Sequence, residues 1–373
     1  MNMKILQIGK FFPPYFYGGI ETVSCALHEE LQKKTDVKAD FLGFLPKSYR
    51  EDINVNENVY LCKTDIDKFS AQLSKSFLRK YKRIRNDYDI ILINMPHPVA
   101  NLALWLFPPK KNVKIILYWH SDIVKQKKLL LFYKPFQKWL IKRSSAIIAP
   151  TKVHTTESDC KELFQNVRYI YNIPYILKYV TKPSNYQVNS AGKKVIFSCG
   201  RLIYYKGFDV LIDAAKYITD NAVIHIAGTG VLKESLQKQI DDSNLSEKVI
   251  LLGRLSDADL QKEYQNCYLY CFPSVERGEM MGMVQFEAFS YGKPIISTNI
   301  PRSGAPTLNE DGVTGFRVPV YNAKALAEKI NNLLQDDILY DKMCKNATEA
   351  SLNYNDPKII EKYIIAFKEI LKE

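Results

Sequence analysis

The stretch KVIFSCGRLIYYKGFDVLIDAAKYI, residues 194–218, decides the fold of this chain. Its first six residues form a short apolar run that is typical of a buried strand. Gly200 and Arg201 end that run, and a segment with helical spacing of its apolar residues begins at Gly207. A short buried strand followed by an amphipathic helix is the repeating unit of a parallel α/β sheet.

The same alternation of strand and helix continues on both sides of this stretch. In the first half the predicted strands are 3–9, 37–44, 89–94, 113–118 and 145–149, with helices such as 20–34 and 69–86 between them. In the second half the predicted strands are 194–199, 222–227, 248–252, 268–272 and 294–298, and the helices lie near 207–218, 230–242, 257–266, 283–291 and 323–335. We therefore expect an α/β protein with two Rossmann-like, doubly wound parallel sheets, one per half, facing across a cleft.

The boundary between the halves falls in a polar segment. Between Tyr179 and Gly192 the periodicity is lost, and Pro, Ser and Asn residues collect. We expect one domain at 1–178 and a second at 192–355. The amphipathic segment 356–373 is expected to form a C-terminal helix that packs back on the first domain.

The composition limits the class of protein. Seven cysteines occur without a metal-type CxxC pair, which indicates a reducing compartment. The apolar run at the N-terminus is too short for a signal peptide, and nowhere do eighteen apolar residues run together. We expect a cytoplasmic protein that does not span a membrane.

Positive charge is concentrated in the first half. Residues 1–190 hold 30 Lys and Arg against 16 Asp and Glu, giving +14, whereas residues 191–373 hold 22 against 24, giving −2. Segments 75–85 and 125–143 combine Lys and Arg with apolar and aromatic residues at helical spacing. That pattern is typical of helices lying on an anionic membrane surface. It fits equally well two ordinary helices with a solvated basic face, and nucleic-acid binding is a third interpretation of the charge.

A pair of glutamates marks the candidate site. Residues 279–287 read EMMGMVQFE, so Glu279 and Glu287 stand eight positions apart, around a predicted helix start near Gly282. A helix N-terminus presents free N–H groups and attracts an anion. Carboxylates before and within that helix are suited to holding sugar hydroxyls on either side of a bound phosphate, so the arrangement favours a nucleotide-sugar.

Other groups fall at predicted strand ends. Arg201 and Lys206 follow strand 194–199, where two cations are suited to neutralising a diphosphate. Gly18 and Gly19 lie between the first strand and its helix, where the backbone is able to approach a phosphate closely. His120 follows strand 113–118; as a lone histidine it is either a site residue or a structural one.

Several common signatures are missing from the sequence. No His, Asp or Glu cluster has metal-ligand spacing, so we expect no metal. The first strand is not followed by GxGxxG, and GxxxxGK[ST] does not occur. We therefore expect no bound cofactor, only a nucleotide-diphosphate sugar as substrate.

In combination these motifs resemble the family-4 retaining glycosyltransferases of the GT-B fold. The resemblance covers nearly the whole chain. The residues that carry it are Gly18, Gly19, Glu21, His120, Gly200, Arg201, Lys206, Gly207, Pro273, Ser274, Glu279, Glu287, Ala288, Gly292, Pro294, Ile295, Gly312, Gly315 and Phe316. The chain departs from the family pattern at Met281, in the loop 302–306 and at 172–174.

The resemblance implies roles for the individual residues. Arg201 and Lys206 would bind the donor diphosphate, and Glu287 would hold the ribose hydroxyls. Glu279 would contact hydroxyls of the transferred sugar, and His120 would lie beside that sugar. Three further contacts are implied: backbone amides near Gly282 and Met283 and near Gly19 would face phosphates and sugar, and Leu255 would lie near the base.

The function implied is a metal-independent hexosyltransferase. It would move a hexose from a nucleotide-diphosphate sugar to a glycan or lipid-linked acceptor in bacterial surface-polysaccharide assembly. The first domain would bind the acceptor, at the inner face of the cell membrane, and no nucleic acid is expected as a partner. Two alternatives stay open at this point: a sugar-nucleotide epimerase of the same architecture, and a non-catalytic basic binding protein.

Overall fold

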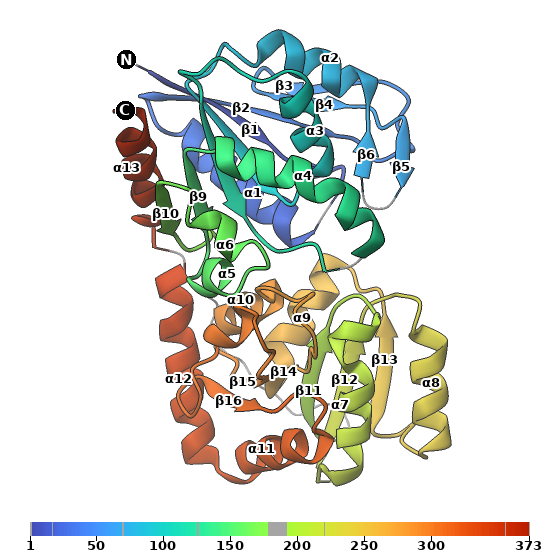
Figure 1. Ribbon diagram of the computed structural model, residues 1–373. Coiled ribbons are helices and arrows are strands. Elements are labelled where there is room, and N and C mark those ends of the chain that lie inside the picture. Colours follow the sequence, from blue (N-terminus) through green and yellow to red (C-terminus); the bar gives the residue numbers. More distant parts are fainter. Residues whose placement is uncertain are drawn as a thin grey trace. The chain divides into compact units, whose positions relative to one another are not determined.

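A computed structural model describes residues 2–16, 18–68, 71–124, 127–177, 192–219, 221–354 and 356–372. The chain folds into two compact units: Met1–Lys178 together with Asp356–Glu373, and Tyr179–Asn355 (Figure 1). The predicted break at 179–192 lies outside the described residues, apart from Gly192.

The first unit is built on an eight-stranded sheet with the order β10-β9-β8-β7-β1-β2-β4-β3. All neighbours are parallel except β3, which is antiparallel to β4. The strands are β1 (Met3–Ile8), β2 (Val37–Phe44), β3 (Ile53–Asn56), β4 (Val59–Cys62), β7 (Ile90–Met95), β8 (Lys114–Trp119), β9 (Ala146–Ala149) and β10 (Tyr169–Asn172). A separate hairpin contains β5 (Ile66–Lys68) and β6 (Ala71–Leu73).

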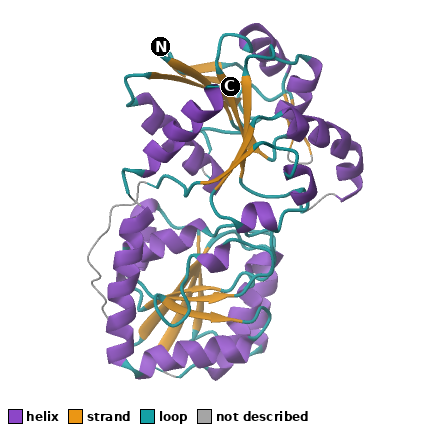
Figure 2. Cartoon of the chain, turned by 60° about the vertical axis from the view of Figure 1, so that its left-hand side comes forward, coloured by secondary structure: helices purple, strands orange, loops and turns teal. Residues whose placement is uncertain are grey.

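Helices lie on both sides of this sheet (Figure 2). They are α1 (Gly19–Gln32), α2 (Lys75–Ile84), α3 (Pro98–Leu106), α4 (Lys127–Arg143), α5 (Val153–Thr156), α6 (Lys161–Phe164) and α13 (Ile359–Leu371). The last of these belongs to the C-terminal segment. Tyr363 of α13 lies 2.7 Å from the hydroxyl of Tyr118 on β8, and Lys368 pairs with Asp36 at 2.8 Å. Buried polar contacts and ion pairs therefore attach the C-terminal helix to the first unit.

The second unit contains a six-stranded, fully parallel sheet with the order β13-β12-β11-β14-β15-β16. The strands are β11 (Lys194–Cys199), β12 (Ala222–Ala227), β13 (Val249–Gly253), β14 (Leu269–Phe272), β15 (Ile295–Thr298) and β16 (Gly315–Val318). The helices are α7 (Phe208–Ala214), α8 (Lys233–Asp242), α9 (Asp257–Asn266), α10 (Met283–Ser290), α11 (Ala323–Gln335) and α12 (Asp337–Tyr354). Alternate residues of β11 enter different apolar clusters, Ile196 one and Phe197 the other, so both faces of this sheet are covered.

The strand order places a topological switch point in each sheet. In the second unit the chain moves from β11 outward to β12 and β13, then returns to β14 on the other side of β11. The strand order therefore has a topological switch point between β11 and β14, at the carboxyl ends of the two strands. Ligands of open α/β sheets bind at such a switch point, beyond the carboxyl ends of the strands. In the first unit the corresponding point lies between β1 and β7.

The structure separates the two basic segments that looked alike in sequence. Segment 75–85 forms α2, whose apolar residues Phe77 and Tyr81 are fully buried against the sheet. The expectation that α2 offers apolar anchors to a membrane is therefore wrong, because those side chains fill the core. Helix α4, by contrast, leaves Leu131 66% and Phe132 78% exposed. None of the described helices is long and apolar enough to cross a membrane.

Candidate active site

Two loops meet at the switch point of the second sheet. The first follows β11 and carries Arg201 and Lys206, and the second follows β14 and begins at Pro273. Gly207 lets them approach: its φ is +67°, and a Cβ built there would lie 2.1 Å from the carbonyl oxygen of Pro273. Only glycine fits such a position. The two loops are also joined by a hydrogen bond of 2.8 Å from the backbone N–H of Val275 to the carbonyl of Tyr205.

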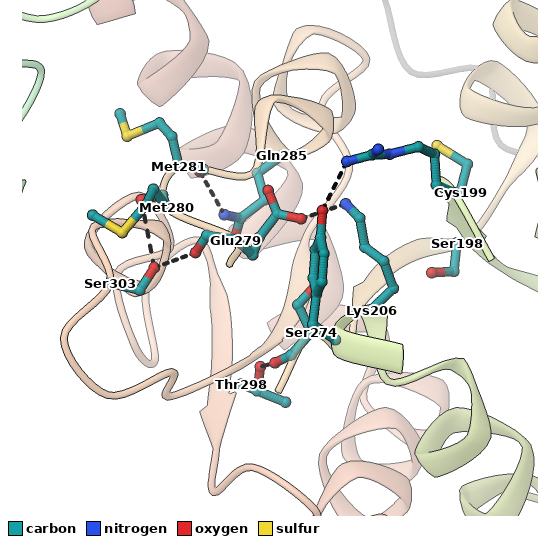
Figure 3. A network of polar contacts seen from close by, with 12 residues as sticks. Ser198, Cys199, Lys206, Ser274, Glu279, Met280, Met281, Gln285, Thr298 and Ser303 are labelled. Carbon is teal, nitrogen blue, oxygen red and sulfur yellow. Dashed lines mark hydrogen bonds and ion pairs between the residues drawn. The ribbon is translucent and has the colours of Figure 1, made fainter. Parts of the chain in front are cut away.

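Lys206 and Glu279 form an ion pair at this switch point (Figure 3). Their side chains are only 12% and 14% exposed. Burial alone would lower the pKa of Lys206, but the charge and hydrogen bond of Glu279 outweigh it, and the pKa is raised. Lys206 is therefore a fixed, charged group. The sequence predicted separate partners for these two residues; the structure shows that they are also partners of each other.

Arg201 is the second cation at this strand end. Its side chain is exposed, and Nη2 donates a hydrogen bond of 2.9 Å to the hydroxyl of Tyr205. This bond orients the guanidinium, which has further N–H donors on an exposed side chain. An exposed Arg beside a nearly buried Lys is suited to grip the two phosphates of a diphosphate, since Arg binds two oxygens at once and Lys acts as a point charge.

Helix α10 begins where the sequence predicted, immediately after Gly282. Gly282 has φ +66°, and a Cβ there would lie 2.6 Å from the ring of Phe272, so this turn also requires glycine. The N–H groups of Met283 and Val284 precede the first hydrogen bond of the helix turn, which Gln285 donates to the carbonyl of Gly282 at 2.9 Å. Such N–H groups at a helix start carry partial positive charge. They add an anion-binding element to the two side-chain cations.

The loop 302–306 holds the glutamate loop in place. Ser303 Oγ donates a hydrogen bond of 2.5 Å to the carbonyl of Glu279 and accepts one of 3.1 Å from the N–H of Ala305. Gln285 on α10 donates a bond of 3.0 Å to the carbonyl of Ala305. Figure 3 shows Ser303 and Gln285 beside Glu279. The sequence marked this loop as a departure from the family pattern but contained no signal for these contacts.

The remaining predicted residues of the second unit lie on neighbouring elements. Glu287 is half-buried on α10, and its Oε2 accepts a hydrogen bond of 2.7 Å from the hydroxyl of Tyr264. Leu255 lies just after β13, partly buried against one of the apolar clusters. The next residue, Ser256, caps α9 by accepting from the N–H of Asp259.

The predicted residues of the first unit lie on other loops. Gly18 immediately precedes α1, which begins at Gly19. A Cβ on Gly18 would lie 2.4 Å from Glu21 Oε2, so the carboxylate of Glu21 folds back against the glycine. The backbone at Gly18 is extended, with φ −162°, so its conformation alone does not require glycine.

His120, which the sequence left as either a site residue or a structural one, is buried. It is 2% exposed, and both ring nitrogens have partners: Nε2 lies 2.8 Å from Asn94 Oδ1, and Nδ1 lies 2.9 Å from the hydroxyl of Tyr175. The amide nitrogen of Asn94 donates to Ser24 and to the carbonyl of Ile8, so its oxygen faces the imidazole. His120 therefore donates from Nε2 and accepts at Nδ1. Burial, aided by nearby His154, lowers the pKa of His120 to about 3, so the ring is neutral.

A cavity of about 690 Å³ opens near the same strand end. Its lining combines charged, amide and apolar side chains: Asp122, Ile123, Lys134, Pro135, Gln137, Lys138, Asp159, Cys160 and Leu163. Asp122, two residues after His120, accepts hydrogen bonds from Trp119 Nε1, Ser158 Oγ and the N–H of Asp159. Within the described part of the chain, no three His, Cys, Asp or Glu residues are grouped so that they could hold a metal ion.

Comparisons with known proteins agree with this geometry. The model described as "Glycosyltransferase Family 4" matches residues 17–172, and "Glycosyl transferases group 1" matches residues 183–350. The chain is 28% identical to O-antigen chain mannosyltransferase C of Escherichia coli, over 90% of each protein. It is 27% identical to D-rhamnosyltransferase WbpZ of Pseudomonas aeruginosa, over 78% of this chain and 75% of that protein.

Solved structures show the same fold. Anabaena Alr3699/HepE, in complex with UDP and glucose, superposes with a TM-score of 0.73 at 21% identity, over 98% of this chain and 99% of that one. Sucrose-phosphate synthase from Thermosynechococcus elongatus gives a TM-score of 0.78 at 16% identity, over 99% of each chain.

The two parallel-sheet units have the GT-B fold of these solved structures. The chain belongs to glycosyltransferase family 4, a family of retaining hexosyltransferases. The expectations of family, fold and enzyme class are thus confirmed.

Proposed function

We propose that this enzyme adds a mannose-configured hexose to a bacterial surface polysaccharide or its lipid-linked precursor. The observation that carries the proposal is the match over 90% of each chain with an O-antigen chain mannosyltransferase, together with a second match to a D-rhamnosyltransferase. D-Rhamnose is 6-deoxy-D-mannose, so the two relatives transfer sugars of the same ring configuration. We infer that the donor sugar here shares that configuration.

The second unit would bind the donor. Arg201 and Lys206 would hold the diphosphate with the N–H groups at the start of α10. Glu287 would accept hydrogen bonds from the ribose, and Leu255 would lie near the base. Glu279, whose charge is already balanced by Lys206, would accept hydrogen bonds from hydroxyls of the transferred sugar.

The reaction would proceed by charge stabilisation at the diphosphate. As the bond between the sugar C1 and the phosphate oxygen breaks, positive charge develops on the ring and negative charge on the leaving phosphate. Arg201, Lys206 and the helix N–H groups stabilise that leaving charge more in the transition state than in the ground state. The acceptor hydroxyl attacks C1 from the same face, and its proton passes to the departing phosphate oxygen, which retains the anomeric configuration.

The first unit would bind the acceptor. The cavity of this unit is lined in part by Asp122 and Ile123, just after His120 in the sequence. Its carboxylates, lysines and amide are suited to binding sugar hydroxyls, and its apolar side chains to packing against the C–H faces of a sugar. We further propose that α4 docks on the anionic inner face of the cell membrane. Leu131 and Phe132 are exposed on this helix. Phe136 lies on the same helix and packs perpendicular to the half-exposed Trp105, with the ring centroids 5.1 Å apart. The family resemblance also assigns His120 and the Gly18–Gly19 turn to the transferred sugar, and we include that assignment in the proposal.

Thermal unfolding with a panel of donors tests the proposal. The panel contains GDP-mannose, GDP-D-rhamnose, UDP-glucose and UDP-N-acetylglucosamine. A ligand that binds only the folded protein at a hundred times its Kd stabilises it by about 2.7 kcal/mol, which is readily measured as a rise in Tm. We expect one of the two mannose-configured donors to give the largest rise, and its transfer product to have the α configuration by NMR.

The outcomes separate the parts of the proposal. A larger rise with a UDP-sugar would overturn the choice of sugar while leaving the transferase reaction in place. Release of free epimerised nucleotide-sugar without an acceptor would instead indicate an epimerase. No response to any donor would contradict donor binding at this site.

A further inference from the structure

We propose that Tyr264 is a positioning residue that fixes the ribose-binding carboxylate of Glu287 and couples it to the strand end that carries Arg201. The inference rests on the proposed role of Glu287 at the ribose. It adds a residue that lies outside the family motifs and that cannot itself touch the donor, because Tyr264 is 2% exposed.

The ring of Tyr264 is held rigidly on α9. It stacks on Tyr291 with a centroid separation of 5.7 Å and an interplanar angle of 9°, and on Tyr270 at 5.6 Å. The ring of Phe197 packs nearly perpendicular to it, with the ring centroids 5.1 Å apart. Aromatic rings packed in this way have one conformation available, so the hydroxyl is fixed in space before any ligand binds.

The direction of each hydrogen bond follows from the chemistry of the groups. The carboxylate of Glu287 accepts only, so the hydroxyl of Tyr264 donates to Oε2 across 2.7 Å. The sulfur of Cys199 lies 3.1 Å from the same hydroxyl oxygen, and its S–H must therefore be the donor there. Burial raises the pKa of Tyr264 well above its usual value and that of Cys199 to about 11, so both groups keep their protons.

The result is a chain of donors that runs from Cys199 through Tyr264 to Glu287. Cys199 is the last residue of β11, immediately before Gly200 and Arg201. The group proposed to bind ribose and the loop proposed to bind diphosphate are thus connected through one phenol. A charge-assisted hydrogen bond to Oε2 restricts the rotation of the Glu287 carboxylate.

The test compares nucleotides with and without ribose hydroxyls. Calorimetry would measure the Kd of GDP against 2′,3′-dideoxy-GDP, with UDP and 2′,3′-dideoxy-UDP as the second pair, using the full chain. In the wild type the ribonucleotide should bind more tightly. Tyr264→Phe should weaken the ribonucleotide by roughly three- to tenfold, part of the strength of a charged hydrogen bond, and leave the dideoxy compound unchanged.

Tyr268→Phe is the matched control. Tyr268 is 1% exposed, and its hydroxyl donates a bond of 2.8 Å to the carbonyl of Leu333 in the other apolar cluster of the unit. The variant removes an equally buried phenolic hydroxyl without touching Glu287. It should leave the preference for the ribonucleotide as in the wild type.

Each remaining outcome identifies which idea fails. Equal Kd values of the wild type for both members of a pair would show that Glu287 does not bind the ribose hydroxyls, which would overturn this part of the proposed function. A wild type that discriminates, with the same ratio of Kd values in Tyr264→Phe, would overturn the positioning role alone. Equal weakening of both nucleotides by Tyr264→Phe would likewise overturn it, since that result indicates a general structural effect.

Discussion

The nearly buried ion pair of Lys206 and Glu279 keeps the lysine protonated when no ligand is bound. A lone ammonium would lose its proton or turn to solvent on burial. The carboxylate prevents both, and it raises the pKa of Lys206 despite the burial. The charge is therefore present before the donor binds, which is the condition for stabilising a leaving diphosphate without reorganisation.

Removal of this charge gives the first prediction. Lys206→Ala should reduce kcat by the equivalent of about 2–4 kcal/mol, the scale of one preorganised charge-stabilising group. Steady-state kinetics with the donor found in the thermal panel would measure it. Lys238→Ala is the control, because Lys238 is exposed and pairs with Asp242 on the surface of α8. Similar kcat values of Lys206→Ala and Lys238→Ala would show that Lys206 does not stabilise the transition state.

At the residue scale the sequence predicted the charged groups but not what holds them. Arg201, Lys206, Glu279 and Glu287 stand in recognisable spacings and were found at one switch point, except that Lys206 and Glu279 also bind each other. Contacts such as Ser303 to the backbone of Glu279 join residues 24 positions apart through a loop. Spacing carries no information on such contacts, because they depend on how the two loops fold.

At the scale of the element, the start of α10 depends on Gly282. An alanine there would keep a φ of +66° and also place its Cβ 2.6 Å from the ring of Phe272. The cost should exceed that of the backbone strain alone, which is on the order of 1–3 kcal/mol. We therefore predict that Gly282→Ala lowers both Tm and donor affinity, measured by thermal unfolding with and without the nucleotide-sugar.

A second glycine separates strain from steric overlap. Gly312 has φ +77°, but a Cβ there meets nothing within 4 Å. Gly312→Ala should therefore cost only the strain and leave donor affinity unchanged. An equal loss of Tm in the two variants would show that the ring of Phe272 moves aside to accommodate a Cβ at position 282. The turn before α10 would then tolerate a side chain.

Sequence analysis missed the edge strands β3, β10 and β16, and also the inner strand β4 and helix α12. Strand β3 reads INVN and exposes three of its four residues, and β16 has only four residues, so neither has an apolar run that marks a strand. The central strands, such as β7 and β11, are buried on both faces and were predicted to within about one residue. Burial leaves a pattern in sequence, whereas edge pairing does not.

At the scale of the whole molecule, the basic first unit and the exposed apolar residues of α4 predict binding to anionic vesicles. Basic residues near such a surface contribute about 1 kcal/mol each, and Lys134 and Lys138 are exposed on α4 beside Leu131 and Phe132. Leu131→Ser with Phe132→Ser should reduce co-sedimentation with phosphatidylglycerol vesicles. Added salt should weaken the binding of the wild type.

The control for this experiment lies in the second unit. Val231 and Ile338 are 87% and 85% exposed, so Val231→Ser with Ile338→Ser removes similar apolar surface away from the basic half. Co-sedimentation of this variant should match the wild type. Equal binding by both double variants would show that α4 is an ordinary solvated helix.

Acid should destabilise the first unit before the second. Four of the five histidines lie in the first unit, and burial lowers the pKa of each, to about 3 for His120 and about 4 for the others, which are His28, His97 and His154. A lowered pKa favours the neutral form in the folded state. The contribution of each histidine to the free energy of unfolding is therefore fully present above pH 6.5, the approximate pKa of histidine in the unfolded chain. It is lost as pH falls below that value, by up to about 1.4 kcal/mol per pH unit for each group.

Hydrogen exchange between pH 7 and pH 5 would locate this loss. Peptides of the first unit should lose protection as pH falls, and His154→Gln should reduce the slope for that unit. His225→Gln, in the second unit, should not change it. Uniform loss of protection in both units would argue against the buried histidines as the cause.

The attachment of α13 to the first unit has a consequence for how the protein is made. Residues 356–373 complete that unit, through Tyr363 and Lys368, yet a ribosome synthesises them after the whole of the second unit. At 5–20 residues per second, residues 1–178 would wait roughly 10–40 s for their last helix. The unit that starts first is therefore finished last, and during that interval its apolar surface under α13 is open to chaperones.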